Sequence, residues 1–165
     1  MPELIVSKGE IQNMSNWCHN TIRIKGEDLN EIIDLMWGHE LGKDEFDFNN
    51  VIPYSRNGKG HLDEHDFHCE KWGTKWNAWN VEEDWEEDGN YDLIWNFETA
   101  WSPSLPITEK LSLMFPECEF EHEYDEPGMC FAGIDKYYNG KKISYEEYDG
   151  DSYIEYCKAK YGEKQ

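Results

Sequence analysis

The chain has 165 residues, of which 36 are acidic and 15 are basic, so its net charge is −21. A surface this acidic repels DNA, RNA and anionic lipid, which excludes direct nucleic-acid binding and favours basic proteins as partners; the alternative is that the charge serves solubility alone. The 8 Trp, 10 Tyr and 7 Phe supply a large apolar core and argue against a disordered chain.

The N-terminal half begins with one strand and one helix. Residues 18–26 alternate apolar and polar side chains, which is typical of a half-buried strand. Residues 29–36 place four apolar side chains on one face of a helix, and these are Leu29, Ile32, Ile33 and Met36. Residues 40–70 are then predicted to form a long insertion, which in a compact domain is often functional.

Two aromatic strands are predicted in the middle of the chain, at 72–80 and 93–101. An acidic connection, 82–90, links them, and we expect them to be antiparallel neighbours. Pro106 then opens a helix that ends before Pro116.

The C-terminal third contains a strand, a hairpin and a tail. The strand is predicted at 117–125. Residues 131–138 and 141–148 flank Asn139-Gly140, a pair typical of a type I′ hairpin turn. The tail, 153–161, is predicted to be a short helix.

Together these elements predict an α+β chain with a ferredoxin-like βαββαβ sandwich. The sandwich carries a long insertion after its first helix and an added C-terminal β-hairpin. We expect a single domain over residues 1–165, with the core at about 16–126 and the hairpin and tail at 127–165.

The cysteines and the apolar runs bear on the compartment. Five cysteines are scattered without a C-x-x-C pair, a usage that favours reduced thiols in the cytoplasm. The sequence has no stretch of 18 apolar residues that would predict a membrane span, and the apolar run within residues 1–9 is too short for a signal peptide.

The first candidate site is a cluster of aromatic and amide side chains. Trp rings would stack on a planar ligand while Asn side chains hydrogen-bond its edge, and a nearby Lys would meet a phosphate. This combination favours a nucleotide-like ligand; the alternative is that the tryptophans pack the core. The cluster comprises Asn16, Trp17, Asn20, Trp72, Thr74, Lys75, Trp76, Asn77, Trp101 and Ser102. Trp79 and Trp85 lie outside it and are expected to be exposed.

The second candidate site is a row of carboxylates on the strand at 117–125. Glu117, Glu119, Glu121, Glu123 and Asp125 would project from one face about 6 to 7 Å apart. Such a row imitates a phosphate backbone and would occupy a nucleic-acid-binding protein, with residues 82–88 as a second acidic patch. The alternative is a solvated outer face that prevents edge pairing.

Other chemistry has weaker signals. Residues 61–69 hold three histidines and Cys69 without a second ligand pair at a familiar spacing, so we predict a polar loop with no metal and no cofactor. Glu98, alone on an apolar strand, is either a buried acid–base candidate or an outward-facing side chain. The sequence contains no motif of nucleophilic catalysis, so we assign no catalytic residue.

Five short motifs stand out together along the chain. They are Asn16-Trp17-Cys18-His19-Asn20, Ile22-Arg23-Ile24-Lys25-Gly26, Trp72-Gly73-Thr74-Lys75-Trp76, Phe97-Glu98-Thr99-Ala100-Trp101-Ser102-Pro103 and Phe131-Ala132-Gly133. As a set they resemble the Api92-like family, also called the YubB ferredoxin-like domain, which occurs in phages and plasmids. The resemblance covers about residues 16–140 and implies a mobile-element protein with a ferredoxin-like fold. It implies no catalytic residue.

Two functions are consistent with these observations. The first is a non-enzymatic accessory protein of a phage or plasmid in the cytoplasm of a bacterial host. It would bind a host protein, for instance a nucleic-acid-binding one, through an acidic and aromatic surface and so act in counter-defence. The alternative is a small-ligand protein that sequesters or cleaves a nucleotide-type signal in a pocket lined by Trp and Asn. The sequence leaves the oligomeric state open.

Overall fold

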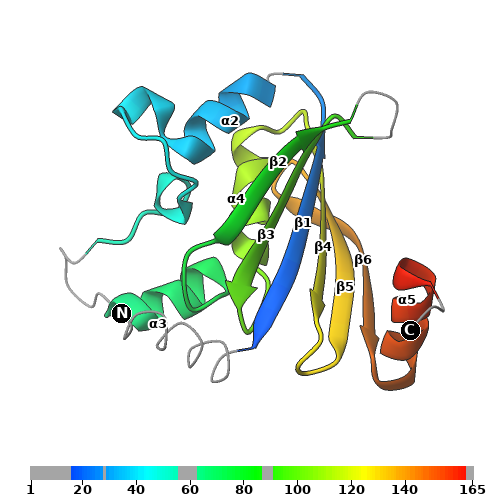
Figure 1. Ribbon diagram of the computed structural model, residues 1–165. Coiled ribbons are helices and arrows are strands. Elements are labelled where there is room, and N and C mark those ends of the chain that lie inside the picture. The colour runs from blue at the N-terminus through cyan, green and yellow to red at the C-terminus, as the bar shows by residue number, and fades with distance from the viewer. Residues whose placement is uncertain (1–15, 28, 56–62, 87–90, 163–165) are drawn as a thin grey trace.

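One antiparallel sheet organises the chain. The computed structural model describes residues 16–27, 29–55, 63–86 and 91–162. Within them, six strands pair in the order β2-β3-β1-β4-β5-β6 (Figure 1). The strands are β1 (Trp17–Lys25), β2 (Trp79–Trp85), β3 (Leu93–Ala100), β4 (Glu119–Glu126), β5 (Phe131–Tyr138) and β6 (Lys141–Asp149).

Helices cover the two faces of this sheet unequally. One face carries α2 (Leu29–Trp37), the short α3 (Glu64–Phe67) and α4 (Leu105–Met114), whereas α5 (Gly150–Tyr161) packs on the other face (Figure 1). The segment between α2 and β2 adds three short turns: η1 (His39–Leu41), η2 (Phe48–Asn50) and η3 (His68–Trp72). In the part of the chain that the structure describes, no helix has the length and apolar character to cross a membrane.

The first four strands and two of the helices have ferredoxin-like topology. Their chain order is β1-α2-β2-β3-α4-β4, and their order in the sheet is β4-β1-β3-β2, which is the βαββαβ arrangement. The prediction of a ferredoxin-like α+β fold is therefore confirmed. β5 and β6 extend the sheet beyond β4, and they are joined by Asn139 and Gly140 at φ 55° and 79°.

Alternation along the strands decides which side chains enter the core. Ile24 of β1 and Trp95 of β3 point toward the helices and are fully buried. Two phenylalanines between α2 and β2 complete this core, because the ring of Phe46 lies 5.0 Å from that of Trp95 and the ring of Phe48 lies 5.4 Å from that of Trp72. The segment after α2 thus contributes core residues as well as surface loops.

The predicted strand at 72–80 is wrong. Trp72 ends the π-helical turn η3 and is only 1% exposed, and its indole N–H donates a 2.8 Å hydrogen bond to the carbonyl of Ile52. Gly73 follows with φ 81°, a left-handed conformation that ends the turn. Strand β2 begins only at Trp79 and continues through acidic residues predicted to be a connection.

The strand predicted at 117–125 is observed as β4, displaced toward the C-terminus. Glu117 lies before this strand, in the turn that follows α4. The turn is closed by a 3.1 Å hydrogen bond from the backbone N–H of Cys118 to the carbonyl of Phe115. Glu117 therefore does not belong to the row of strand carboxylates.

Glu83 ties β2 to the core. One carboxylate oxygen of Glu83 accepts hydrogen bonds from two indole N–H groups, at 2.9 Å from Trp37 of α2 and at 2.7 Å from Trp95 of β3. Hydrogen bonds to a charged acceptor are stronger than neutral ones, and a buried donor that loses its acceptor keeps its full desolvation cost. This side chain holds α2, β2 and β3 together.

Replacing Glu83 by alanine is expected to lower the free energy of unfolding by about 2 to 4 kcal/mol, because two indole N–H groups lose their acceptor. Glu83→Gln keeps an acceptor oxygen at the same position and is expected to cost about 1 kcal/mol. Urea denaturation of both variants measures the difference. Equal stabilities for the two variants would show that the hydrogen bonds to Trp37 and Trp95 contribute little.

Candidate functional site

Half of one sheet face is covered by none of the helices in the described residues. This open face belongs to β2, β3 and β1 (Figure 1), and Lys160 of α5 lies at its side. It contains a groove of about 780 Å³. The groove is lined by His19, Asn20, Thr21, Arg23, Asn80, Val81, Glu82, Asp84, Glu86, Ile94, Asn96, Phe97, Glu98 and Lys160.

The β2 side of the groove is acidic. Glu82 and Asp84 project from β2, Glu86 follows the strand, and Glu98 projects from β3. His19 lies opposite Glu98, with 3.6 Å between its Nδ1 and the Glu98 carboxylate. Among the residues that the structure describes, Glu82, Asp84 and Glu86 form no ion pair. Their charges are therefore directed toward the groove and the solvent.

Tryptophans continue this surface past the His19 end of the groove. The ring of Trp17 stacks on that of Trp79 at 6.3 Å, with an interplanar angle of 28°, and lies 6.1 Å from that of Trp76. The Nζ of Lys75 lies 5.2 Å from the ring centroid of Trp76. Trp79 is 42% exposed and pairs with Glu98 across the sheet, so aromatic and acidic groups are adjacent here.

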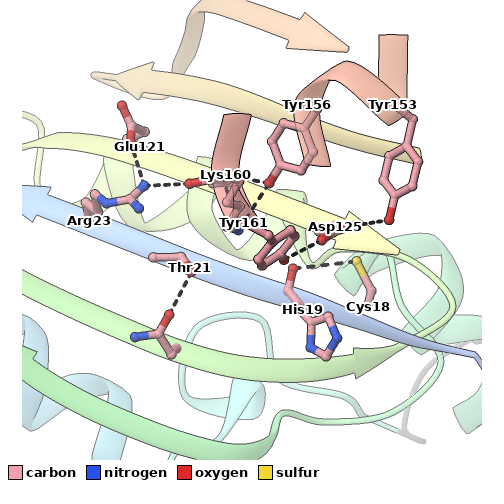
Figure 2. A network of polar contacts seen from close by, with 12 residues as sticks. Cys18, His19, Thr21, Arg23, Glu121, Asp125, Tyr153, Tyr156, Lys160 and Tyr161 are labelled. Atoms are coloured by element: carbon pink, nitrogen blue, oxygen red, sulfur yellow. Dashed lines mark hydrogen bonds and ion pairs between the residues drawn. The ribbon is translucent and has the colours of Figure 1, made fainter. Parts of the chain in front are cut away.

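The opposite side of the groove is formed by a salt-bridge cluster beneath α5. Arg23 of β1 lies 2.7 Å from the carboxylate of Glu121 and 3.1 Å from that of Glu123 (Figure 2). Lys160 of α5 lies 3.3 Å from Glu123, whose carboxylate also accepts a 2.7 Å hydrogen bond from the hydroxyl of Tyr156. The two cations next to the groove are thus already paired within the protein.

Tyrosines of α5 also reach Asp125. The hydroxyl of Tyr153 donates to one oxygen of this carboxylate at 2.8 Å, and that of Tyr161 donates to the other at 2.7 Å (Figure 2). Burial raises the pKa of both hydroxyls, and so do their hydrogen bonds to Asp125. Both tyrosines consequently remain protonated donors.

The charge state of Glu123 follows from competing effects. Burial alone would raise the pKa of this carboxyl group. The hydrogen bond from Tyr156 and the charges of Lys160 and Arg23 outweigh that effect, so the pKa of Glu123 is lowered. The carboxylate is ionised and fully engaged inside the protein.

The predicted row of carboxylates is therefore only partly a surface. Glu119, Glu121, Glu123 and Asp125 do share one face of β4, as the alternation predicts. Glu119 is exposed, but Glu123 is 8% and Asp125 1% exposed, because α5 covers them. With Glu117 outside the strand, these side chains do not form the continuous solvated row that was expected.

The predicted aromatic and amide cluster is divided between the surface and the interior. Trp17, Lys75 and Trp76 come together at the end of the groove. Trp72 is a core residue, and Asn77 is bound internally, with its amide N–H donating to Asp47 at 2.7 Å.

The remaining members of that cluster have mainly structural contacts. Asn16 accepts a 2.7 Å backbone hydrogen bond from the N–H of Trp101, which is exposed at the end of β3. Asn20 is buried, and its amide group donates a 2.8 Å hydrogen bond to the hydroxyl of Thr99. Its carbonyl oxygen accepts a 2.7 Å hydrogen bond from Nε2 of His122.

The histidine-rich segment makes few contacts that suit a metal. His61 lies outside the described residues. Nε2 of His65 is 3.9 Å from the sulfur of Cys69, and the ring of His68 stacks on that of Trp72 at 3.9 Å. Within the described ranges, no three His, Cys, Asp or Glu side chains gather as metal ligands. None of the five cysteines, all of which lie in the described ranges, forms a disulfide.

Two features of the site were missed by the sequence analysis. The first is β2, whose acidic residues line the groove. The sequence analysis assigned residues 82–90 to an acidic connection between strands, so it did not predict their pairing with β3. The second is the polar face of α5. Tyr153, Tyr156 and Lys160 recur at i, i+3 and i+7, which is the spacing of one helix face and could have indicated a buried polar contact.

Comparisons with known proteins agree with the topology. A family model described as "Ferredoxin-like domain in Api92-like protein" matches residues 71–162. The crystal structure of a protein api92 from Yersinia pseudotuberculosis is similar, with a TM-score of 0.50 and 26% sequence identity over 64% of this chain. The match spans 40% of the Yersinia chain. The chain has no match among curated proteins.

Proposed function

The chain belongs to the family of Api92-like proteins with a ferredoxin-like domain, and we propose that it is a non-enzymatic binding protein that captures a basic segment of a partner protein on its open sheet face. In this proposal it is an accessory protein of a phage or plasmid. It acts in the cytoplasm of a bacterial host on a basic host protein, such as a nucleic-acid-binding component of a defence system.

One observation carries the proposal: four carboxylates and a stacked tryptophan pair share a sheet face that none of the described helices covers. Glu82, Asp84, Glu86 and Glu98 supply a local negative field that attracts a basic segment and accelerates its association. The rings of Trp17 and Trp79 offer aromatic surface for cation–π contacts with Arg or Lys.

A nucleotide-type ligand remains the alternative function. It is supported by the stacking of Trp17 and Trp76 with Lys75 nearby. It is opposed by the internal hydrogen bonds of Asn20 and Asn77, which leave these amides engaged with other protein groups. The acidic groove beside the tryptophans also disfavours an anionic ligand.

Charge reversal of the groove is expected to abolish partner binding. We would compare the wild-type chain with the triple variant Glu82→Lys, Asp84→Lys and Glu98→Lys. Each tagged protein is incubated with lysate of its bacterial host and analysed by native mass spectrometry. A basic protein should be recovered with the wild type and reduced by about tenfold or more with the variant.

The matched control carries the same charge change elsewhere. It reverses Glu40, Glu109 and Glu155, which are exposed and lie outside the groove, and it should bind like the wild type. Equal loss in both triple variants would mean that only net charge matters. A mass increment of a few hundred daltons, lost in Trp76→Ala but kept in the groove variant, would favour the nucleotide-type alternative instead.

A further inference from the structure

The outer edge of β2 has no pairing partner among the residues that the structure describes. β2 is the terminal strand of the sheet and pairs with β3 alone among the described strands (Figure 1). The outer groups of such a strand are available for pairing with another chain, a mode of recognition called strand addition. The orientation of each backbone group on β2 follows from two hydrogen bonds.

Backbone bonding alternates along β3. The N–H of Trp101 donates to the carbonyl of Asn16 at 2.7 Å, so the odd-numbered residues of β3 bond to β1 and the even-numbered ones bond to β2. The N–H of Glu86 donates to the carbonyl of Asp92 at 2.9 Å, in the same register as the β2-β3 ladder. Both observations place the backbone groups of Glu82 and Asp84 toward β3.

The N–H and C=O groups of Glu83 and Trp85 consequently point away from the sheet. Side chains on β2 alternate as well. Glu82 and Asp84 pair with groove residues of β3 and face the groove, whereas Glu83 and Trp85 face the other side. The Glu83 carboxylate is held by the indoles of Trp37 and Trp95, and Trp85 is 52% exposed.

We propose that the partner segment adds to the β2 edge as an extra strand, with basic side chains alternating with apolar ones. This inference rests on the proposed function and specifies the partner for the same surface. The basic residues lie on the groove side opposite Glu82 and Asp84, where cross-strand pairs of opposite charge are favourable. The apolar residues lie on the other side, against the ring of Trp85.

The test uses a nine-residue peptide in which lysine and valine alternate. The control peptide has the same composition, with its lysines consecutive and its valines consecutive. Binding is measured by fluorescence anisotropy at low salt. Amide hydrogen exchange of the protein is then followed by NMR with and without saturating peptide.

We expect the alternating peptide to bind more tightly than the block control. We also expect it to slow exchange at the amides of Glu83 and Trp85 by about tenfold or more, because strand addition gives these N–H groups an acceptor. The amides of Glu82 and Asp84, which already bond to β3, should change much less.

The possible failures are distinguishable. If neither peptide binds, the proposed function is contradicted. If both bind equally and exchange at Glu83 and Trp85 is unchanged, strand addition is wrong, while capture of basic segments in the groove stands. A variant with Trp85→Ala keeps the outward N–H groups. Because it lacks the ring of Trp85, it should bind the alternating peptide more weakly. Because its outward N–H groups remain, it should still show slowed exchange at Glu83.

Discussion

Acidification below about pH 6.5 is expected to destabilise the folded chain, because His122 is buried and neutral. Burial lowers the pKa of this imidazole from 6.5 to about 3. Between these pH values the unfolded chain takes up a proton that the folded chain does not. The contribution of neutral His122 to folding stability is therefore fully present above pH 6.5 and is lost as the pH falls. Each pH unit in this window costs about 1.4 kcal/mol, so two units remove about 2 to 3 kcal/mol.

The local structure explains why the proton is excluded. His122 is fully buried between β4 and α4, where the hydroxyl of Thr108 bonds its Nδ1 at 2.7 Å and Asn20 bonds its Nε2 at 2.7 Å. The amide of Asn20 donates to Cys18 and Thr99, so its oxygen faces the imidazole as an acceptor. The neutral ring therefore satisfies both neighbours.

Urea denaturation at a series of pH values measures this effect. In His122→Gln the decline between pH 6.5 and 4.5 should be shallower by about one proton, whereas His65→Asn, which removes an exposed histidine, should behave like the wild type. NMR of the wild-type imidazole should show His122 still neutral at pH 4.5. A protonated His122 in folded protein at that pH would contradict the argument.

The variant Glu123→Lys, which reverses the charge of this side chain, is expected to lower the free energy of unfolding by about 3 to 5 kcal/mol. The new ammonium group would lie beside Arg23 and Lys160, both of which lose the carboxylate they now contact at 3.1 and 3.3 Å. Removing one partner of a buried ion pair leaves uncompensated charge, which is far more costly than losing an exposed pair.

Glu119→Lys is the matched control, because it makes the same substitution on the same face of the same strand. Glu119 is exposed, so its reversal should change stability by about 0.5 kcal/mol or less. Comparable stabilities for the two variants, measured by urea denaturation, would show that the cluster beneath α5 is dispensable. The result also bears on binding experiments, because a Glu123 variant that is unfolded at the assay temperature loses its partner for that reason alone.

Much of the sheet was predictable because its periodicity is local. The alternation from Cys18 to Gly26 and from Leu93 to Trp101 records directly which side chains meet the helices. The segment at 72–80 alternates as well, yet its rings pack for a different reason. Trp72 packs in the core against Phe48 and donates to the carbonyl of Ile52, and both of these residues lie at least twenty positions away, so they leave no local pattern.

The candidate site shows the same division. The pattern at 117–125 correctly placed the carboxylates of Glu119, Glu121, Glu123 and Asp125 on one face of a strand, although Glu117 lies before that strand. Periodicity specifies a face but not what covers it, and here the cover is a helix from the end of the chain. Glu82 and Asp84 were recognised as acidic, but their role depends on strand pairing with β3, which only the assembled sheet reveals.

The two hydrogen bonds that Glu83 accepts also couple the core of the protein to the outer edge of β2. The indole protons of Trp37 and Trp95 share one carboxylate oxygen, and that carboxylate belongs to a residue whose backbone faces outward on β2. A change in the twist of β2 must therefore alter both bonds together. Indole proton resonances are few and well separated from those of backbone amides. Changes in the resonances of Trp37 and Trp95 would therefore report whether a segment is bound at the outer edge of β2.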